Sequence, residues 1–303
     1  MSTPQMGIFS LGDASHSFLE FNLRGSPAAK DVVAAVADMH NQRKTIEAVN
    51  LVVGLRPELW RTAAPTDAPA DATSFDRALV GPDGYTMPAT QADVFVWIAG
   101  PSYDRVFDVA SACVTHLATV AAPVRELTGW TYRVNRDLTG FEDGTENPTL
   151  EDAPGVALIP DGKPGAGGSI LLFQQWRHDV AAWGAEPVTV QEQVIGRTKP
   201  DSIEFPEDLM PADSHVTRTT LDENGIERKI FRRNTPYGNL GDHGTLFIGF
   251  ANERDPLQRM LERMAGIGDG VRDALTRYVT ALTGAYYFIP ALSTLAPFAP
   301  SAD

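Results

Sequence analysis

The chain has 303 residues, of which 43% are hydrophobic, a normal proportion for a globular protein and enough for a large core in one or two domains. Its 39 acidic and 25 basic residues give a formal net charge of -14, which disfavours nucleic acid and anionic membranes as partners and favours small molecules. The single cysteine excludes an intrachain disulfide, and no segment has the run of apolar residues that a membrane span needs. Residues 1–11 show no signal-peptide pattern, so a cytoplasmic location is expected.

The first part of the chain predicts alternating strands and helices. The apolar runs at 18–22 and 95–100 have the length and composition of buried strands. From Val32 to Met39 and from Val106 to Leu117, apolar residues recur at intervals of three and four, which predicts two amphipathic helices. Each helix should pack its apolar face on a sheet.

A dense group of unusual residues follows at 139–148, where glycines, a proline and three carboxylates crowd into ten residues. Such a loop has a fixed shape. One interpretation is a solvated acidic turn and another is a functional loop. A calcium site is disfavoured, because the oxygen-ligand spacing of an EF-hand is absent.

The glycine-rich segment 161–168 resembles a phosphate-binding loop only superficially. It lacks the terminal Lys-Ser/Thr, and it leads into the apolar run 170–174, which predicts a strand and not a helix. We interpret the segment as a turn.

A further strand is predicted at 229–238, where an apolar run ends in two arginines and an asparagine. Adjacent strand residues face opposite ways, so one of Arg232 and Arg233 can point inward while Arg232 and Asn234 share a face. An inward arginine needs an anionic partner. A surface ion-pair site is the alternative interpretation.

The apolar run at 247–252 lies about half the chain length after the run at 95–100, and the same offset relates Phe173 to Phe21. Each run precedes a helical pattern. The repeat predicts two similar halves, at 1–138 and 139–303, each in the order strand, helix, strand, strand, helix, strand. The expected fold class is α+β, a duplicated ferredoxin-like fold with antiparallel sheets and packed helices, of the dimeric α+β barrel type.

Several segments of the second half together resemble the dye-decolourising peroxidase family, and specifically its shorter bacterial B-type members. Residues 140–148 look like the family's signature loop, 194–199 and 231–238 like its flanking motifs, and 283–288 like its C-terminal motif. The short segment 214–218 lies between the flanking motifs. The resemblance implies a haem peroxidase with a duplicated ferredoxin-like fold, in which the second half carries the haem site.

On the distal side of one haem b per chain, the resemblance makes Asp143 and Arg232 the catalytic pair and Asn234 their neighbour. It places Gly144 and Thr145 in the loop that contacts the cofactor. A carboxylate can shuttle the proton that peroxide cleavage requires, and a guanidinium can stabilise the developing negative charge. Either residue could dominate.

On the proximal side, the resemblance makes His215 the axial ligand of the haem iron. Without it, His215 and His243 are equal candidates. Asp273 is placed behind His215, where a carboxylate would add imidazolate character to the ligand. Arg197 would pair with a haem propionate. Glu142 departs from the small or apolar residue expected in B-type relatives and would affect access to the haem edge.

The implied activity is reduction of hydrogen peroxide and one-electron oxidation of aromatic dyes, phenols or other small reductants through a ferryl intermediate. One alternative is a haem-handling protein for storage, transfer or iron release. Another is a cofactor-free ferredoxin-like oxygenase or binding module. Family members are commonly homo-oligomers, and some are encapsulin cargo through a C-terminal peptide, although residues 297–303 contain no recognised signal of that kind. The physiological reductant and any use of manganese stay open.

Overall fold

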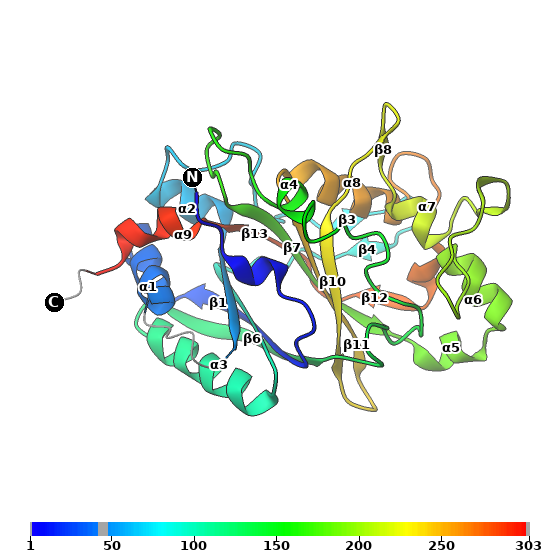
Figure 1. The fold of residues 1–303 in the computed structure, drawn as a ribbon, viewed down its shortest axis with the longest axis horizontal. Helices are drawn as coiled ribbons and strands as arrows, with labels where there is room; N and C mark the ends of the chain where they lie inside the picture. The colour runs from blue at the N-terminus through cyan, green and yellow to red at the C-terminus, as the bar shows by residue number, and fades with distance from the viewer. Residues whose placement is uncertain (1, 42–47, 301–303) are drawn as a thin grey trace.

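The computed structural model describes residues 2–41 and 48–300, arranged as an elongated α+β molecule (Figure 1). The first half contains, in chain order, η1 (Met6–Phe9), β1 (Ser15–Leu23), α1 (Ala29–Asn41), β2 (Asn50–Leu55), α2 (Pro57–Ala63), β3 (Leu79–Val80), β4 (Thr86–Met87), β5 (Val94–Gly100), α3 (Tyr103–Leu117) and β6 (Ala121–Trp130). The predicted strands and helices of this half are confirmed as β1, α1, β5 and α3.

The second half contains more short helices between its strands. Its elements are α4 (Ala153–Ala157), β7 (Ser169–His178), α5 (Val180–Ala185), α6 (Val188–Ile195), η3 (Glu207–Leu209), α7 (His215–Thr219), β8 (Asp222–Glu223), β9 (Ile226–Glu227), β10 (Phe231–Gly238), β11 (His243–Ala251), α8 (Arg254–Met264), η4 (Ala274–Arg277), β12 (Val279–Ala281), β13 (Ala285–Ile289), α9 (Leu292–Leu295) and η5 (Ala296–Phe298). The strands predicted at 170–174, 229–238 and 247–252 are β7, β10 and β11, and residues 161–168 form turns.

The sheet topology confirms the duplicated ferredoxin-like fold. The first half has the strand order β6-β1-β5-β2 and the second has β10-β11-β7-β13. In both, the first strand of the unit lies in the centre beside the third, as in a ferredoxin-like βαββαβ unit. The boundary placed after residue 138 falls in the loop between β6 and β7, and the division at that residue stays a prediction.

The two four-stranded units join edge to edge into a closed barrel. β10 pairs with β6 through Tyr237 and Gly129, and β13 pairs with β2 through Phe288 and Leu55. A Cβ atom at Gly129 would lie 2.4 Å from Cγ2 of Thr235, so a glycine permits the close approach at the first junction. Because both outer edges are paired, the barrel removes the exposed strands that favour aggregation.

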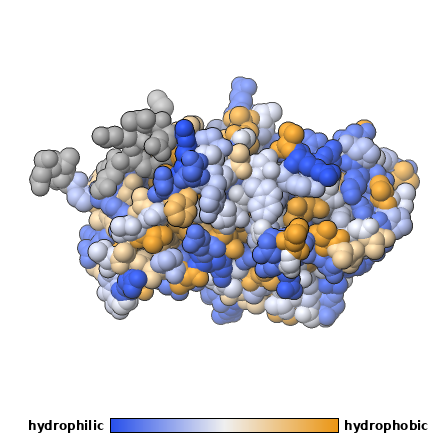
Figure 2. All heavy atoms as spheres, turned by 90° about the horizontal axis from the view of Figure 1, so that it is seen from below, coloured by the Kyte–Doolittle hydropathy of each residue, from blue (hydrophilic) through white to orange (hydrophobic). Residues whose placement is uncertain are grey.

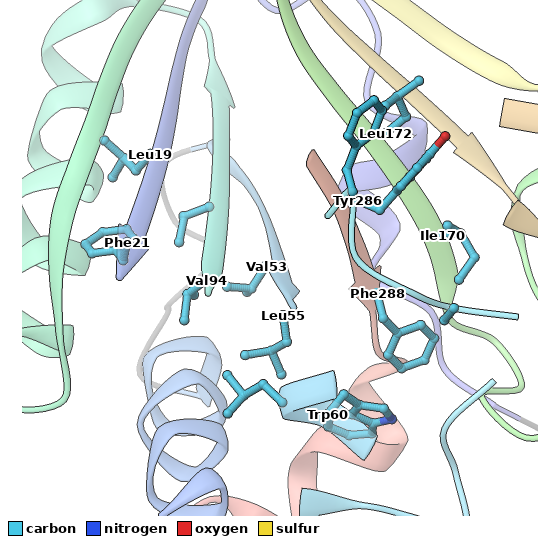
Figure 3. Close-up of a cluster of buried hydrophobic side chains, with 14 of the residues drawn as sticks. Leu19, Phe21, Val53, Leu55, Trp60, Val94, Ile170, Leu172, Tyr286 and Phe288 are labelled. Carbon is cyan, nitrogen blue, oxygen red and sulfur yellow. The ribbon is translucent and has the colours of Figure 1, made fainter. Parts of the chain in front are cut away.

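Alternating strand residues build two separate layers of core. One cluster lies between the sheets and the helices that cover them, and Figure 3 shows Trp60 of α2 beside Phe288 of β13 within it. Their ring centroids are 5.5 Å apart. The other cluster takes side chains from the strands of both halves, so it fills the barrel interior, and it is rich in aromatic rings such as Phe95 and Phe173.

The last described residues pack against the first half of the chain. Phe298 of η5 lies with its ring centroid 5.9 Å from that of Trp60. Residues 297–303 contain no recognised encapsulin-targeting signal, and the last three of them, 301–303, lie outside the described residues. Within the described ranges, no helix has the length and hydropathy to cross a membrane. On the face shown in Figure 2, hydrophobic residues form small groups among hydrophilic ones.

Candidate active site

A cavity lies between the second-half sheet and the helices that cover it. Strands β7, β10 and β11 supply one wall, and the segments around α6, α7 and α8 supply the others. Its polar lining includes Asp137, Asp143, Thr145, Glu146, Arg197, His215, Arg232 and Asn234. Its apolar lining includes Phe141, Ile195, Val216, Leu221, Phe247, Met260, Leu261, Met264 and Leu275. A largely apolar pocket with a few convergent polar groups is typical of a cofactor site.

His215 is fixed at the start of α7. Ser214 caps this helix, since its hydroxyl accepts a hydrogen bond from the backbone N–H of Thr217. The His215 Nδ1 lies 2.7 Å from Oδ2 of Asp273, whose side chain is fully buried. The other carboxylate oxygen of Asp273 accepts from the backbone N–H of Leu275. With Nδ1 engaged, Nε2 is the ring nitrogen that is left for a metal ligand.

A network of arginines attaches α7 to the end of α8. The buried guanidinium of Arg218 binds both carboxylate oxygens of Asp269, at 2.8 and 2.9 Å, and donates to the carbonyl of Arg263. Arg263 in return donates to the carbonyls of Thr217 and Arg218. These contacts hold a five-residue helix that could not be stable alone, and so they hold His215.

Asp143 is held by Asn234, its neighbour on β10. Its Oδ1 accepts from the Asn234 side-chain amide at 2.7 Å, and its Oδ2 accepts from the Asn234 backbone N–H at 2.9 Å. The side-chain amide of Asn135 also holds this residue, because its Nδ2 donates a hydrogen bond to the backbone carbonyl of Asp143. Asp143 is therefore fixed by hydrogen bonds, which differs from the solvated acidic turn considered as an alternative for 139–148.

Asn147 attaches the same loop to β10. Its side-chain amide donates to the Arg232 carbonyl at 2.8 Å and accepts from the Arg232 N–H at 2.9 Å. It thereby satisfies the backbone of the residue beside Asn234. This role was not predicted from the sequence, although an asparagine directly before a proline is a typical turn signal.

The glycine at 144 adopts a left-handed backbone conformation. Its φ is 75°, and a Cβ atom there would lie 2.9 Å from Nδ2 of Asn147. Thr145 lines the cavity, and its contact with the cofactor stays a prediction. Gly144 instead lines a second, outer cavity, so its predicted contact with the cofactor stays untested.

The two adjacent arginines of β10 do face opposite ways. Arg232 lines the cavity together with Asn234, which fits the shared face expected from strand alternation. Arg233 is the buried one, with its guanidinium over the ring of Trp97. Its expected anionic partner is not found, since no carboxylate among the described residues forms an ion pair with either arginine.

Arg197 lines the cavity and is buried. Its Nη2 forms ion pairs with Glu146, at 2.6 Å, and with Glu204, while Nη1 donates to the Ser202 carbonyl. The guanidinium is therefore engaged with two carboxylates. Glu146 and Glu204 are each partly solvated, so either could yield its place to a carboxylate of similar charge.

Among the histidines, the structure separates the two candidates that the residues alone left equal. His215 lines the cavity, whereas His243 lies at the β10–β11 turn with Nδ1 2.9 Å from the Asn239 carbonyl. His178 also lines the cavity and was not singled out by its sequence context. Its Nε2 lies 3.0 Å from the Thr245 hydroxyl, and burial lowers its pKa to about 4.

Asp137 is a further cavity residue that the sequence did not reveal. Loss of solvation raises its pKa to about 6, with the charge of Asp143 adding to the rise and hydrogen bonds from Thr139 opposing it. Glu142, the departure from the B-type pattern, also lines the cavity and has an exposed side chain.

These residues fit a haem. A neutral imidazole with a buried carboxylate behind it is the proximal arrangement, and an apolar pocket with Asp143 and Arg232 on the same lining is suited to peroxide chemistry. The apolar side chains of the lining, such as Ile195, Phe247 and Met260, would contact a porphyrin face. The fold and the site together therefore indicate a haem peroxidase built on an α+β barrel.

Comparison with known proteins identifies the family. Residues 134–294 match the family described as Dyp-type peroxidase, C-terminal. A dye-decolorizing peroxidase of Mycolicibacterium paratuberculosis is 35% identical over 89% of this chain and 82% of its own length. The chain belongs to the dye-decolourising peroxidase family, and it is a peroxidase.

Solved structures agree. A Dyp-type peroxidase from Shewanella oneidensis superposes with a TM-score of 0.92 at 31% identity, covering 99% of this chain and 100% of its own. DyPB from Rhodococcus jostii gives a TM-score of 0.88 at 33% identity, with 97% of each chain covered. Structures of variants of that protein are in complex with haem.

Proposed function

We propose that this protein binds haem b through Nε2 of His215 and uses it to reduce hydrogen peroxide at the expense of small organic reductants. The observation that carries the proposal is the hydrogen bond of 2.7 Å between His215 and the buried Asp273, in the cavity that also holds Asp143 and Arg232. When bound, the haem iron supplies the redox chemistry that no side chain of this site can provide.

Asp273 keeps His215 oriented and electron-rich. Its Oδ2 accepts the Nδ1–H, which fixes the tautomer that leaves Nε2 deprotonated for the iron. Asp273 is fully buried and also bonded to a backbone N–H, so it cannot swing away. A strongly hydrogen-bonded imidazole favours the oxidised iron.

Asp143 is the proton carrier in this proposal. Asn234 binds both of its carboxylate oxygens, which holds the group in one orientation along the cavity wall. A positioned carboxylate can take a proton from one oxygen of hydrogen peroxide and return it to the other oxygen, which would leave as water while the bound haem supplies the electrons.

Arg232 provides the fixed positive charge. Within the described residues its guanidinium has no carboxylate partner and lines the cavity, so its charge is available to the oxygen that becomes negative as the peroxide bond breaks. Its backbone is held by Asn147. Arg197 would bind a propionate by exchanging Glu146 or Glu204 for it.

The haem-handling alternative is not favoured, because the relatives that match most of the chain are named dye-decolorizing peroxidases. The cofactor-free alternative required His215, Arg197 and Arg232 to be structural ion pairs, and Arg232 is not paired with a carboxylate in the described residues. A cytoplasmic location and a homo-oligomeric assembly remain predictions, and association with an encapsulin stays an open possibility.

The test is the absorption spectrum of the haem-loaded protein with His215 replaced. His215→Ala should lose the axial ligand, and the ferric spectrum should change or the haem should be lost. His243→Ala, at the β10–β11 turn outside the cavity, is the matched control and should keep the wild-type spectrum. A wild-type spectrum in His215→Ala would refute the assignment.

A further inference from the structure

A second, outer cavity of about 510 Å³ lies on the other side of the residues proposed for peroxide chemistry. It opens between the loop at 10–13, the loop at 131–136 and the loop at 143–150. Three residues, Asp143, Arg232 and Asn234, line both this cavity and the inner one. They form the partition between the two spaces.

Three arginines and two aspartates line the outer cavity, so its lining carries an excess of positive charge. Its lining includes Arg136, Arg232 and Arg233, and none of them forms an ion pair with a carboxylate in residues 2–41 or 48–300. Arg136 donates only to backbone carbonyls. The chain as a whole has a formal net charge of -14, so three arginines without carboxylate partners around one cavity differ from its overall acidic character.

The two aspartates of the lining make their hydrogen bonds to groups other than the arginines. Asp143 gives both oxygens to Asn234, and Asp13 accepts from the Ser10 hydroxyl and, at 3.4 Å, from Asn50. Burial lowers the pKa of Arg233, and the charges of Asp143 and Asp13 oppose that change, but neither aspartate forms an ion pair with an arginine of the lining in the described residues.

Arg233 is the arginine of this lining whose guanidinium is buried with unpaired donors. Its residue exposure is only 9%, and one Nη2–H donates to the Ile8 carbonyl at 2.9 Å. The Nε and Nη1 atoms are buried with no hydrogen-bond partner. Aromatic rings of Trp97 and Phe231 lie under the guanidinium, with centroids 5.5 and 5.0 Å away. A buried guanidinium with unpaired donors is costly unless an anion binds it.

Exposed apolar side chains lie at the rim of the outer cavity, among polar residues such as Thr131 and Asn135. Leu11, Trp130, Val134 and Leu150 all line it, and all are exposed large hydrophobic residues. A buried cationic centre beneath exposed apolar side chains is complementary to a flat apolar molecule with one negative end. An apolar cavity of roughly 150 Å³ holds benzene, so the space here is ample for one substituted ring.

We propose that the outer cavity is a binding site for a single-ring aromatic carboxylate. The carboxylate accepts hydrogen bonds from the Arg233 guanidinium, and the ring lies against the rim at Trp130. A ring with a phenolic hydroxyl would be held beside Asp143 and Arg232. Its use as reductant, giving one electron to the peroxide-oxidised enzyme and its phenolic proton to solvent to leave a phenoxyl radical, rests on the function proposed above.

The test is calorimetric titration of the haem-loaded protein, without peroxide, with 4-hydroxybenzoate, the neutral 4-hydroxybenzamide and inorganic sulfate. We expect one carboxylate per chain and at least tenfold weaker binding of the amide and of sulfate. Arg233→Met should weaken carboxylate binding at least tenfold. Arg24→Met is the control, because Arg24 follows the opposite end of β1 from Asp13 and donates to the Ala121 carbonyl.

A second variant guards against misfolding of Arg233→Met. Val134 is 91% exposed, so Val134→Glu adds a negative charge at the rim without touching the core, and it should weaken carboxylate binding several-fold. Equal binding by wild type and both variants, equal binding of amide and carboxylate, or no saturable binding would each overturn the proposal. Equal binding of sulfate would overturn the aromatic part. Because no peroxide is present, these outcomes are independent of whether peroxidase activity is found.

Discussion

Asn234 binds both oxygens of the Asp143 carboxylate, one through its side chain at 2.7 Å and one through its backbone at 2.9 Å. Removing the side chain leaves the backbone contact to Oδ2 and removes the contact to Oδ1, so the Asp143 carboxylate is less firmly held against rotation about its Cβ–Cγ bond. We expect Asn234→Ala to slow the reaction with peroxide by about tenfold, since a general base works only when it is positioned. Rapid-mixing absorption spectroscopy of the haem-loaded protein measures that rate.

The matched control for this variant is Asn239→Ala. Asn239 also uses its side chain to hold backbone, accepting from Gly241 and Asp242, but it lies in the β10–β11 turn outside the cavity. Its peroxide rate should equal that of wild type. Equal rates in Asn234→Ala and Asn239→Ala would show that Asn234 does not position Asp143.

Asp273 should tune the haem through His215. Asp273→Asn keeps an acceptor oxygen for the Leu275 N–H and removes the negative charge behind the imidazole. Because imidazolate character stabilises ferric iron, we expect the reduction potential of the haem to rise while His215 remains the ligand. Potentiometric titration measures the change. An unaltered potential would mean that the 2.7 Å contact does not influence the iron.

Two glycines of the signature loop provide a matched pair. Gly140 and Gly144 both have positive φ, of 87° and 75°, so alanine at either position should cost about 1 kcal/mol of stability. The added Cβ at 144 would meet Nδ2 of Asn147 at 2.9 Å, whereas at 140 it would meet the flexible end of Lys199.

We therefore expect Gly144→Ala to slow the peroxide reaction by displacing Asn147 from the Arg232 backbone, and Gly140→Ala to leave it nearly unchanged. Urea unfolding gives the stability change for both, and rapid mixing gives the rates. The interpretation is wrong if both variants lose activity equally.

Acid sensitivity should arise partly from His16. Burial lowers the pKa of His16 to about 4, and its Nδ1 accepts a hydrogen bond from Trp97, which protonation would break. The folded pKa lies below the unfolded value, so the unfolded chain takes up the proton first as the pH falls. Stability contributed by the neutral imidazole is then lost between about pH 6.5 and pH 4, by about 2–3 kcal/mol.

His16→Gln should flatten this part of the stability profile. Urea unfolding of the haem-free chain, followed by circular dichroism at pH 6.5 and pH 4.5, measures the slope. A slope equal to that of wild type would show that His16 titrates normally in the folded protein.

The architecture was largely readable from sequence because it depends on local periodicity and on an internal repeat. The runs at 95–100 and 247–252 are third strands of equivalent units, β5 and β11, which is why their offset indicated duplication. Closure of the barrel was expected only because the predicted fold class, the dimeric α+β barrel type, includes it. It depends on single edge contacts such as Tyr237 with Gly129, which have no local sequence signal.

The resemblance to the family selected His215 and Asp143, and the structure places both on the lining of one cavity. Some supporting residues were not predicted. Asn147 and Asp137 act through hydrogen bonds and desolvation that arise only when distant segments meet. Strand alternation showed that Arg232 and Arg233 face opposite ways, but burial of Arg233 follows from the packing of η1 and Trp97 against β10.

The central claim is that Asp143 and Arg232 act on peroxide in a cavity whose iron ligand is His215. The most direct measurement is the bimolecular rate of the haem-loaded protein with one equivalent of hydrogen peroxide, at millisecond resolution, in wild type, Asp143→Ala and Arg232→Ala. We expect rapid spectral conversion in wild type and a rate lower by roughly 10²- to 10⁴-fold in at least one variant. Wild-type rates in both variants would contradict the account.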